Sequence, residues 1–393
     1  MKSKINTNWV DKGRNYFIFG YFGWFNAGDD AIGYSVIESI VDKNPHSYLS
    51  ITIQNSYFSH FAKKYYSNTH IKFINFNFFS IIKEIINADF FIFTGGTHFH
   101  DEDQYSFRRI SLFLKLYGLT LLARSLGKRA ILLGHGIGPV SKFWSKILLK
   151  GVLSNSKFIF VRDNNSKETV ENLGYSKKCY LGFDCSSVLF NRNFELTSLI
   201  GKTIGISLLP AFSIYSKSPE KDYGQLLSLS KIICNLKIDY PDLHIVLFAF
   251  RTGNLHSDTQ YLKDLINQNK SYSNIFEIIE YDGDILGFIA AINKCHSFIG
   301  MRYHSSLFAY LLSKPQIMID YMGKCSSLAH DISLPDNAII PLEDVASIKL
   351  GERIRNLIEH PDGFKAKSPP IDSIEKTRLM FNLLMNNYFS LSD

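Results

Sequence analysis

The chain has 393 residues, of which 46% are hydrophobic and 14% aromatic, a composition that excludes a disordered protein. The net charge of +7, from 43 Lys and Arg against 36 Asp and Glu, is modest, and no dense Lys/Arg block marks a nucleic-acid-binding arm. The charge fits better with a small anionic substrate or a weak affinity for an acidic membrane surface. The length predicts two domains of roughly 150 to 200 residues each.

The cysteines and the N-terminus bear on the cellular compartment. The five cysteines are scattered without a CxxC pair, which argues against a disulfide framework or a zinc site and for a reducing compartment. The first residues lack the apolar segment of a secretory signal, and no run approaches the roughly 20 apolar residues that span a bilayer. We therefore expect a cytoplasmic protein, either free or at the inner face of the membrane.

In the first half of the chain, short apolar runs alternate with longer helical stretches. This alternation, with strands apolar on both faces, is typical of a parallel sheet covered by helices on both sides. We predict helices over 107–126 and 166–173, among others. The predicted strands are YFIFG (16–20), LSITIQ (49–54), IKFINF (71–76), DFFIFTGG (89–96), AILLGHG (130–136), KFIFVRD (157–163) and KCYLGFD (178–184).

A polar stretch over 191–203 interrupts the pattern, which then starts again. Helices are predicted over 225–236 and 305–312, and the strands are IGISLLP (204–210), LHIVLFAF (243–250), IFEIIEY (275–281), CHSFIGM (295–301) and PQIMIDY (315–321). We therefore predict an α/β protein with two Rossmann-like parallel-sheet domains, 1–192 and 203–365, that face each other across a cleft. A C-terminal helix within 370–393 has an apolar face and could pack back across both domains.

The segment GYFGWFNAGDDAIG (20–33) is a predicted turn from the first strand into a helix. In open α/β sheets, ligands bind at the carboxyl ends of the strands, where the N–H groups of the following helix are unpaired. Asn26 and Asp29 would either contact a ligand there or only form the turn and cap the helix. The segment alone leaves both possibilities open.

Five other polar or glycine-rich segments follow predicted strands, at the same sheet edges. His98, His100 and Asp101 form an HxHD pattern that could bind a metal ion, but without a matching cluster elsewhere a turn or a substrate contact is the better interpretation. His135 would either satisfy backbone groups within a glycine loop or contact substrate. The segments are FTGGTHFHDE (93–102), LLGHGIGP (132–139), FVRDNNS (160–166), FIGMRYHSS (298–306) and IDYMGK (319–324).

Two of these segments point to an anion-binding site. Arg302 and His304 come at a strand end where a helix begins near Ser305, and Lys324 follows the next strand. A guanidinium fork, a helix N-terminus and an ammonium group suit a compact ligand with a phosphate and a carboxylate. In contrast, Arg162 and Asp163 are expected to be a helix start, with Asp163 as the cap and Arg162 paired with an acidic neighbour. The GxxxxGK[ST], GxGxxG and GxSxG motifs of ATPases, dehydrogenases and α/β-hydrolases are absent.

Taken in order, these motifs resemble those of the polysaccharide pyruvyltransferase family over about 20–328. Members typically carry a G-x-x-N-x-G-D-x-A-I turn, a strand ending in glycines, a GxGIGP loop, a VRDxxS segment, an R-x-H helix start and a later Lys. Two positions depart from the family pattern: His135 stands where Gln is more usual, and Thr94 or Thr97 where a third Gly is usual. The corresponding segments here are GWFNAGDDAI (23–32), FTGGTHFHD (93–101), GHGIGP (134–139), VRDNNS (161–166), RYHSSLFAYLLSKP (302–315) and DYMGK (320–324).

The resemblance implies a fold similar to the B-type glycosyltransferases and transfer of pyruvate from phosphoenolpyruvate to a sugar diol as a cyclic ketal. The acceptor would be a saccharide, free or lipid-linked, of an exopolysaccharide or another cell-envelope glycan. No cofactor and no metal ion are required. The resemblance implies donor contacts by Arg302, His304, Ser305 and Lys324, and acceptor contacts by Asn26, Asp29, Asp101 and His135.

The reaction assigns roles to three of these residues. His304 is the candidate acid that protonates carbon 3 of the enol, because imidazole titrates near neutral pH. Arg302, together with Lys324, would stabilise the departing phosphate. Asp29 would orient or deprotonate an acceptor hydroxyl. Two alternatives remain: a B-type glycosyltransferase that uses a nucleotide sugar, and a non-catalytic glycan-binding assembly protein on the same fold.

Overall fold

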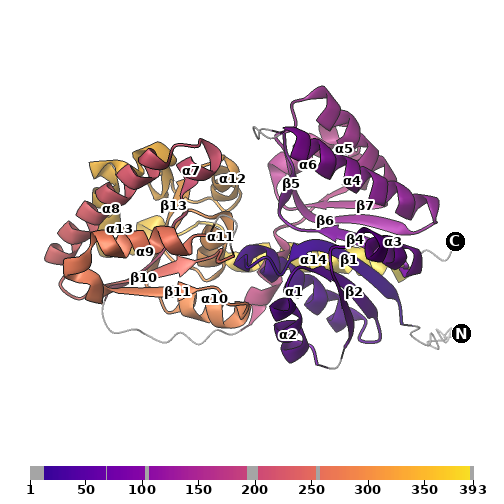
Figure 1. The fold of residues 1–393 in the computed structure, drawn as a ribbon, viewed down its shortest axis with the longest axis horizontal. Coiled ribbons are helices and arrows are strands. Elements are labelled where there is room, and N and C mark those ends of the chain that lie inside the picture. Colours follow the sequence, from indigo (N-terminus) through magenta and orange to yellow (C-terminus); the bar gives the residue numbers. More distant parts are fainter. Residues whose placement is uncertain (1–12, 68, 102–105, 193–201, 254–256, 390–393) are drawn as a thin grey trace, which may run out of the picture.

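A computed structural model describes residues 13–67, 69–101, 106–192, 202–253 and 257–389. Two parallel β-sheets, each flanked by helices, form two α/β domains (Figure 1). This is the fold class that the alternation of strands and helices predicted. Within these residues, no helix combines the length and the apolar character needed to cross a bilayer.

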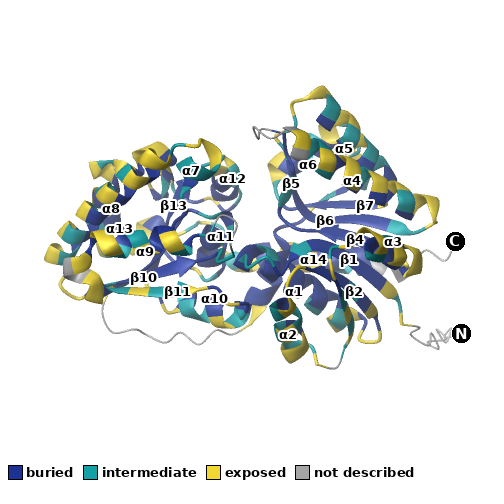
Figure 2. Cartoon of the chain, viewed as in Figure 1, coloured by how far each residue is buried: buried dark blue, intermediate teal, exposed yellow. Residues whose placement is uncertain are grey.

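The first sheet has the strand order β3-β2-β1-β4-β6-β7-β8, and β5 pairs with β6. Its central strands are buried on both faces (Figure 2), which explains their continuous apolar runs. Phe17 on β1 stacks on Phe91 of the neighbouring β4, with ring centroids 5.6 Å apart. The elements are β1 (Asn15–Phe22), α1 (Ala27–Lys43), β2 (Tyr48–Ile53), α2 (Ser56–Tyr65), β3 (His70–Ile74), α3 (Phe78–Asn87), β4 (Phe90–Thr94), β5 (Thr97–Phe99), α4 (Ser106–Ser125), β6 (Arg129–Ile137), α5 (Phe143–Asn155), β7 (Phe158–Val161), α6 (Asn164–Asn172), η1 (Ser176–Lys178), β8 (Cys179–Leu181) and η2 (Cys185–Asn191).

The second sheet has the strand order β11-β10-β9-β12-β13-β14 and is also parallel. The strand order reverses between β9 and β12, so the loops after these two strands border the crevice where ligands bind in such folds. The elements are β9 (Lys202–Ser207), α7 (Ala211–Tyr215), α8 (Pro219–Asp239), β10 (Leu243–Ala249), α9 (Thr259–Gln268), η3 (Lys270–Ile275), β11 (Phe276–Glu280), α10 (Ile285–Asn293), β12 (Ser297–Gly300), α11 (Tyr303–Leu311), β13 (Gln316–Asp320), α12 (Lys324–Asp331), η4 (Asp336–Ala338), β14 (Ile339–Pro341), η5 (Leu342–Ala346), α13 (Ile348–Glu359), η6 (Pro361–Phe364) and α14 (Pro370–Phe389).

The two domains are packed together rather than loosely tethered. One cluster of buried apolar residues extends from the first sheet through α1 and η2 into the second sheet. The last helix, α14, returns to the first domain, where it contacts η2 and α1, and the hydroxyl of Ser187 donates to Thr377 at 2.7 Å. Because α14 also contacts α11 of the second domain, the C-terminal helix bridges the two domains.

Some element boundaries differ from those predicted. The strand predicted over 178–184 ends at Leu181, because Asp184 already caps the 3₁₀ helix η2 through the N–H of Ser186. The helix predicted over 225–236 is the longer α8, which begins with Pro219 in its first turn. The three-residue strands β5 and β14 were not predicted, since so short a run carries no periodicity. Most of the predicted 191–203 linker lies outside the described residues.

Candidate functional site

The glycine-rich turn before α1 is hydrogen-bonded to the second domain. Asn26 forms an isolated antiparallel bridge with Arg251, which follows β10. On either side of this bridge, the N–H of Ala27 donates to the carbonyl of Phe250 at 2.9 Å and the N–H of Thr252 donates to that of Phe25 at 3.0 Å. The carboxyl end of β1 and that of β10 therefore meet at one place, and the side chains of both sheet edges converge there.

Asn26 and Asp29 lie at the start of α1. Asn26 is the N-cap: its Oδ1 accepts from the N–H of Gly28 at 3.2 Å, and its Nδ2 donates to Oδ2 of Asp29 at 2.6 Å. Burial raises the pKa of Asp29, while the charges of His304, Arg251 and Lys324 oppose that rise. The capping function considered for Asn26 is therefore present, and the Asp29 carboxylate faces cations of the second domain.

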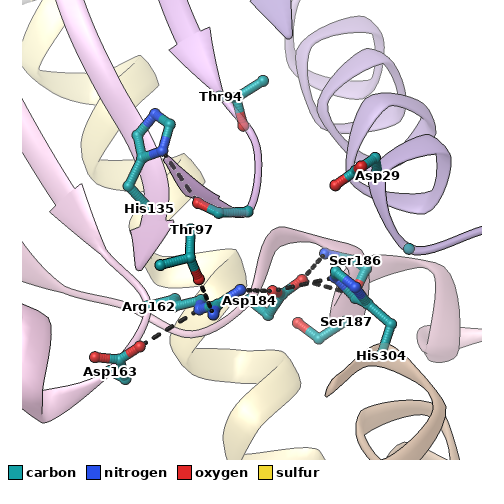
Figure 3. Close-up of polar contacts among 12 residues, drawn as sticks. Asp29, Thr94, Thr97, His135, Arg162, Asp163, Asp184, Ser186, Ser187 and His304 are labelled. Atoms are coloured by element: carbon teal, nitrogen blue, oxygen red, sulfur yellow. Dashed lines mark hydrogen bonds and ion pairs between the residues drawn. The ribbon is translucent and has the colours of Figure 1, made fainter. Parts of the chain in front are cut away.

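The imidazole of His304 is held between the two domains. It packs so closely on Gly28 that a Cβ atom added to that glycine would lie 2.0 Å from Nδ1 of the ring. On the other side, Nε2 lies 3.6 Å from Oδ2 of Asp184, which is ion-pair distance (Figure 3). Only a glycine at position 28 leaves room for the ring in this position.

Asp184 is a fully buried carboxylate that sequence reasoning did not single out. Burial by itself would raise the pKa of Asp184, but the nearby charges of His304 and Arg162 and the hydrogen bonds from Ser186 hold it well below its usual range. The N–H and hydroxyl of Ser186 donate to Oδ1 at 3.0 and 2.7 Å. Asp184 is thus ionised at neutral pH, beside the imidazole.

Arg162 supports Asp184 from the opposite side. Its Nη1 lies 3.4 Å from Oδ2 of Asp184, and its Nη2 donates to the hydroxyl of Thr97 at 2.9 Å (Figure 3). The guanidinium lies 3.9 Å from the centroid of the Tyr303 ring, one residue before His304. Asp163 caps α6 by accepting from the N–H of Ser166. The expectation of a helix start with a paired arginine is therefore confirmed, and the pair also buttresses the His304 site.

Two arginines of the second domain share one buried carboxylate. Arg302 donates to Asp258 through Nε, at 2.6 Å to Oδ2, and through Nη2, at 2.5 Å to Oδ1. The backbone N–H of Arg251 also donates to Asp258, and its Nε is buried with no hydrogen-bond partner among the described residues. Burial lowers the pKa of Arg251, as does the nearby charge of Arg302. The charges of Asp29 and Asp258 oppose this lowering, so the arginine pair faces carboxylates of both domains.

Lys324 adds a third cation to this edge. It is the first residue of α12, after Gly323, whose φ of +70° lies in the region that glycine adopts without strain. Its Nζ lies 5.0 Å from the centroid of the Tyr321 ring. Since the charge of Lys324 lowers the pKa of Asp29, the ammonium group is on the side that faces the first domain.

Three of the predicted contact residues have local hydrogen-bond partners in the structure. Asp101 is buried and accepts from the N–H groups of Ser141 and Lys142 at 2.8 and 2.7 Å and from the Ser145 hydroxyl at 2.5 Å, so it holds the start of α5 in place. Ser305 is also buried, and its hydroxyl donates to the carbonyl of Arg302 at 2.8 Å. Both side chains are committed to local backbone groups.

His135 is the third. It is fully buried beneath the glycine loop, with Nε2 3.0 Å from the carbonyl oxygen of Phe93 and Nδ1 3.4 Å from that of Gly96. This is the backbone-satisfying role that the sequence analysis considered for His135. Burial lowers the pKa of His135 to about 4, and the ring is neutral at physiological pH.

The HxHD pattern does not form a metal site in the described part of the chain, where no three His, Cys, Asp or Glu side chains lie close enough to hold an ion. His98 stacks on Tyr21, with ring centroids 4.9 Å apart. A pocket of about 560 Å³ does exist in the second domain, but it lies at the amino ends of β9 and β12, near Lys202 and His296, at the opposite end of the strands from the cations.

Three residues of the site were missed from the sequence. Arg251 follows a predicted strand, and Asp184 ends another, so the strand-end criterion that selected Arg302 could have found both. Asp258 lies seven residues beyond Arg251 in the chain, after a loop, and nothing in the local pattern marks it.

Comparisons with known proteins agree with this fold. The polysaccharide pyruvyl transferase family model matches residues 26–322, from Asn26 to beyond β13. The amylovoran biosynthesis protein AmsJ of Erwinia amylovora is 25% identical over 297 residues, which are 69% of each chain.

Two solved structures share the fold at low identity. The S. aureus MnaA–UDP complex has a TM-score of 0.62 at 11% identity, covering 96% of this chain and 98% of that one. The UDP-GlcNAc 2-epimerase of Neisseria meningitidis, bound to UDP-GlcNAc, has a TM-score of 0.60 at 14% identity, covering 95% and 100%. The architecture is therefore similar to the B-type glycosyltransferases, and the match from Asn26 onward shows that the chain belongs to the polysaccharide pyruvyl transferase family.

Proposed function

We propose that this transferase of polysaccharide biosynthesis moves pyruvate from phosphoenolpyruvate to two hydroxyls of a saccharide, forming a cyclic ketal and releasing phosphate. The observation that carries the proposal is the group of three cations, Arg251, Arg302 and Lys324, at one sheet edge, where the buried carboxylates of Asp258 and Asp29 face them. Burial raises the pKa of Asp29, so positive charge exceeds negative charge among the described residues of this edge. Phosphoenolpyruvate carries a phosphate and a carboxylate on the same carbon, C2, and suits such a group of cations.

Within this proposal, Arg302 has a different role from the one expected. Two of its N–H groups are already bonded to Asp258, so Asp258 fixes the guanidinium in one orientation. Arg251 then offers the buried Nε that has no partner in the described residues. We assign the direct donor contact to Arg251 and Lys324, with Arg302 held beside them as a fixed charge that stabilises the departing phosphate.

His304 is the proposed acid. The proton on the imidazole passes to carbon 3 of the enol, which becomes a methyl group, while an acceptor hydroxyl adds to carbon 2. The C2–O bond to phosphate then breaks, and the second hydroxyl closes the ketal. One hydroxyl proton replaces the proton that His304 lost, and the other leaves with phosphate. Asp184, 3.6 Å from Nε2, positions the ring and balances its charge when it is protonated.

Asp29 is the proposed base for the acceptor hydroxyl. Burial raises its pKa, and a carboxylate with a raised pKa is a better proton acceptor at neutral pH. Asn26 holds Oδ2 of this carboxylate at 2.6 Å. The acceptor saccharide would therefore bind on the first-domain side, beside α1 and the Gly95–Gly96 loop, where Gly96 lies near Asp29.

The experiment is an assay of phosphate release from phosphoenolpyruvate in the presence of a panel of p-nitrophenyl glycosides. We expect His304→Ala and Asp29→Asn to abolish turnover while both variants remain folded. His330→Ala is the matched control. His330 is an exposed histidine in the last turn of α12, the helix that begins with Lys324. Full activity of both His304→Ala and Asp29→Asn would remove the assignment.

A nucleotide-sugar glycosyltransferase is the second candidate, because three cations could also hold a diphosphate, and the epimerase of similar fold from Neisseria meningitidis was solved with UDP-GlcNAc bound. The same assay run with UDP-sugars distinguishes the two. Release of nucleotide without consumption of phosphoenolpyruvate would favour the glycosyltransferase, whereas no turnover with either donor, despite binding of a glycan, would favour a non-catalytic assembly protein.

A further inference from the structure

Three neighbouring helices of the first domain present large apolar side chains to solvent. Phe79, Phe107 and Phe143 are 80%, 87% and 80% exposed, and each comes from a different helix. On α4 the exposed apolar residues recur every seven positions, so they form a stripe along one side of the helix. The set is Phe78, Phe79 and Ile86 on α3, Phe107, Leu114 and Leu121 on α4, and Phe143 and Ile147 on α5; we call it the α3–α5 face.

These stripes belong to one surface. The helix α4 contacts both α3 and α5, and the inner sides of the three helices pack into one core through residues such as Ile81, Phe113 and Leu149. Their outer sides are therefore adjacent, as the exposed colouring of the helices indicates (Figure 2). Each helix begins after the carboxyl end of a strand, so the exposed phenylalanines near the starts of α3, α4 and α5 lie towards the sheet edge that holds Asp29.

Basic residues dominate the segment that contains α4 and α5. From residue 104 to residue 162 the sequence contains eleven Lys and Arg and no Asp or Glu. Lys146 and Lys150 on α5 are exposed among the apolar side chains, whereas the ammonium group of Lys115 on α4 lies over the rings of Phe19 and Phe76. On α3, the carboxylate of Glu84 is buried and paired with Lys72. The α3–α5 face thus combines exposed aromatic and aliphatic tips with the positive charges of Lys146 and Lys150.

We propose that the α3–α5 face docks on the surface of an anionic lipid bilayer. Apolar tips enter the boundary between head groups and acyl chains, while Lys and Arg attract anionic head groups. A second copy of the chain is a poorer occupant, because a symmetric contact would bring like charges together. A fully solvated helix face would not need eight large apolar side chains on adjacent helices.

Docking in this way would bring the carboxyl edge of the first sheet close to the bilayer. A saccharide acceptor on a lipid carrier could then reach Asp29 without leaving the membrane. This consequence rests on the proposed function, but the docking itself does not, since it uses no residue of the cation group or of the His304 site.

The test is co-sedimentation of the full chain with phosphatidylcholine vesicles, with or without about one third phosphatidylglycerol. The first variant, Phe107→Ser/Phe143→Ser, removes two apolar tips, and the second, Lys146→Glu/Lys150→Glu, reverses two charges. The matched control is Ile348→Ser/Lys349→Glu on α13 of the second domain, where both side chains are also exposed. Melting temperatures without vesicles show that each variant is folded.

We expect the chain and the control to sediment with the anionic vesicles, and each α3–α5 variant to bind at least about tenfold more weakly. Added salt should weaken binding of the unaltered chain. The proposal is overturned if the unaltered chain does not bind, if the variants bind as well as the control, or if the α3–α5 variants instead break a dimer seen by light scattering. Phosphate release in solution is read separately, so failure of docking and failure of the proposed function are distinguishable.

Discussion

Replacing Gly28 with alanine should remove most of the turnover without unfolding the protein. The new Cβ would lie 2.0 Å from Nδ1 and 2.3 Å from Cγ of His304, whereas ordinary contact begins at 3.4 Å. The methyl is fixed to the backbone of α1, so the imidazole must move by about 1.4 Å to make room for it. The ring then leaves the position in which its Nε2 lies 3.6 Å from Oδ2 of Asp184. A misplacement of about 1 Å costs about 10²-fold in rate, and general acid catalysis is worth about 10²- to 10⁴-fold. We therefore expect kcat to fall about a hundredfold or more.

The effect on stability should be much smaller. Overpacking costs about 1–3 kcal/mol, and replacing a helical glycine with alanine returns up to about 1 kcal/mol. Gly224→Ala on α8 is the matched control, because no atom lies within 4 Å of the added methyl. This variant should keep full activity and melt at the same or a slightly higher temperature.

The assay measures phosphate release from phosphoenolpyruvate for Gly28→Ala, His304→Ala and the double variant. If Gly28 acts only by giving His304 its place, the double variant should have the residual activity of His304→Ala and no less. The reasoning is refuted if Gly28→Ala keeps turnover within about twofold of the unaltered chain. It is also refuted if the double variant falls far below His304→Ala.

Three further substitutions test other parts of the account. Arg251→Gln should raise KM for phosphoenolpyruvate by about ten- to a hundredfold, since hydrogen bonds to charged groups are worth about 1.5–3 kcal/mol. The control is Arg355→Gln on the surface, which loses only an exposed pair with Asp239 and should leave KM unchanged. Equal KM values for the two variants would contradict the assignment. Asp184→Asn should lower the free energy of unfolding by about 3–5 kcal/mol, because the buried Arg162 loses a counter-charge, and chemical denaturation with an unchanged midpoint would count against it. His135→Gln should flatten the acid side of the stability profile. The pKa of His135 is about 4 in the folded chain and about 6.5 in the unfolded chain. The unfolded chain therefore binds the extra proton, and the free energy of unfolding falls by about 3 kcal/mol as pH falls from 6.5 to 4. Glutamine carries no charge, so an equally steep loss of stability in the variant, measured by thermal melts at several pH values, would show that the slope has another source.

The sequence was sufficient to predict the fold class and the sheet edges at which the site lies. The predicted strands end in Gly20, Asp163 and Met301, close to where β1, β7 and β12 end. This succeeded because strands buried on both faces have unmistakable apolar runs, and because polar residues directly after such runs must lie at the carboxyl edge. The meeting of the two edges followed from the two-domain prediction.

The role of each side chain was less predictable, because hydrogen-bond partners come from distant parts of the chain. Asp101 is saturated by groups around Ser141, forty residues later, and Arg302 is oriented by Asp258, forty-four residues earlier. Neither partnership leaves a local pattern. The charge asymmetry of 104–162, in contrast, was visible in the sequence, but its significance depended on the exposure of α3, α4 and α5.

The most direct test of the central claim is mass spectrometry of p-nitrophenyl glycosides after incubation with the purified chain and phosphoenolpyruvate. The account predicts a product heavier than its glycoside by the mass of pyruvic acid less one water, with one phosphate released for each product molecule. It also predicts loss of that product in His304→Ala and Gly28→Ala. Release of UDP from a UDP-sugar, with a hexosylated product and no consumption of phosphoenolpyruvate, would contradict it.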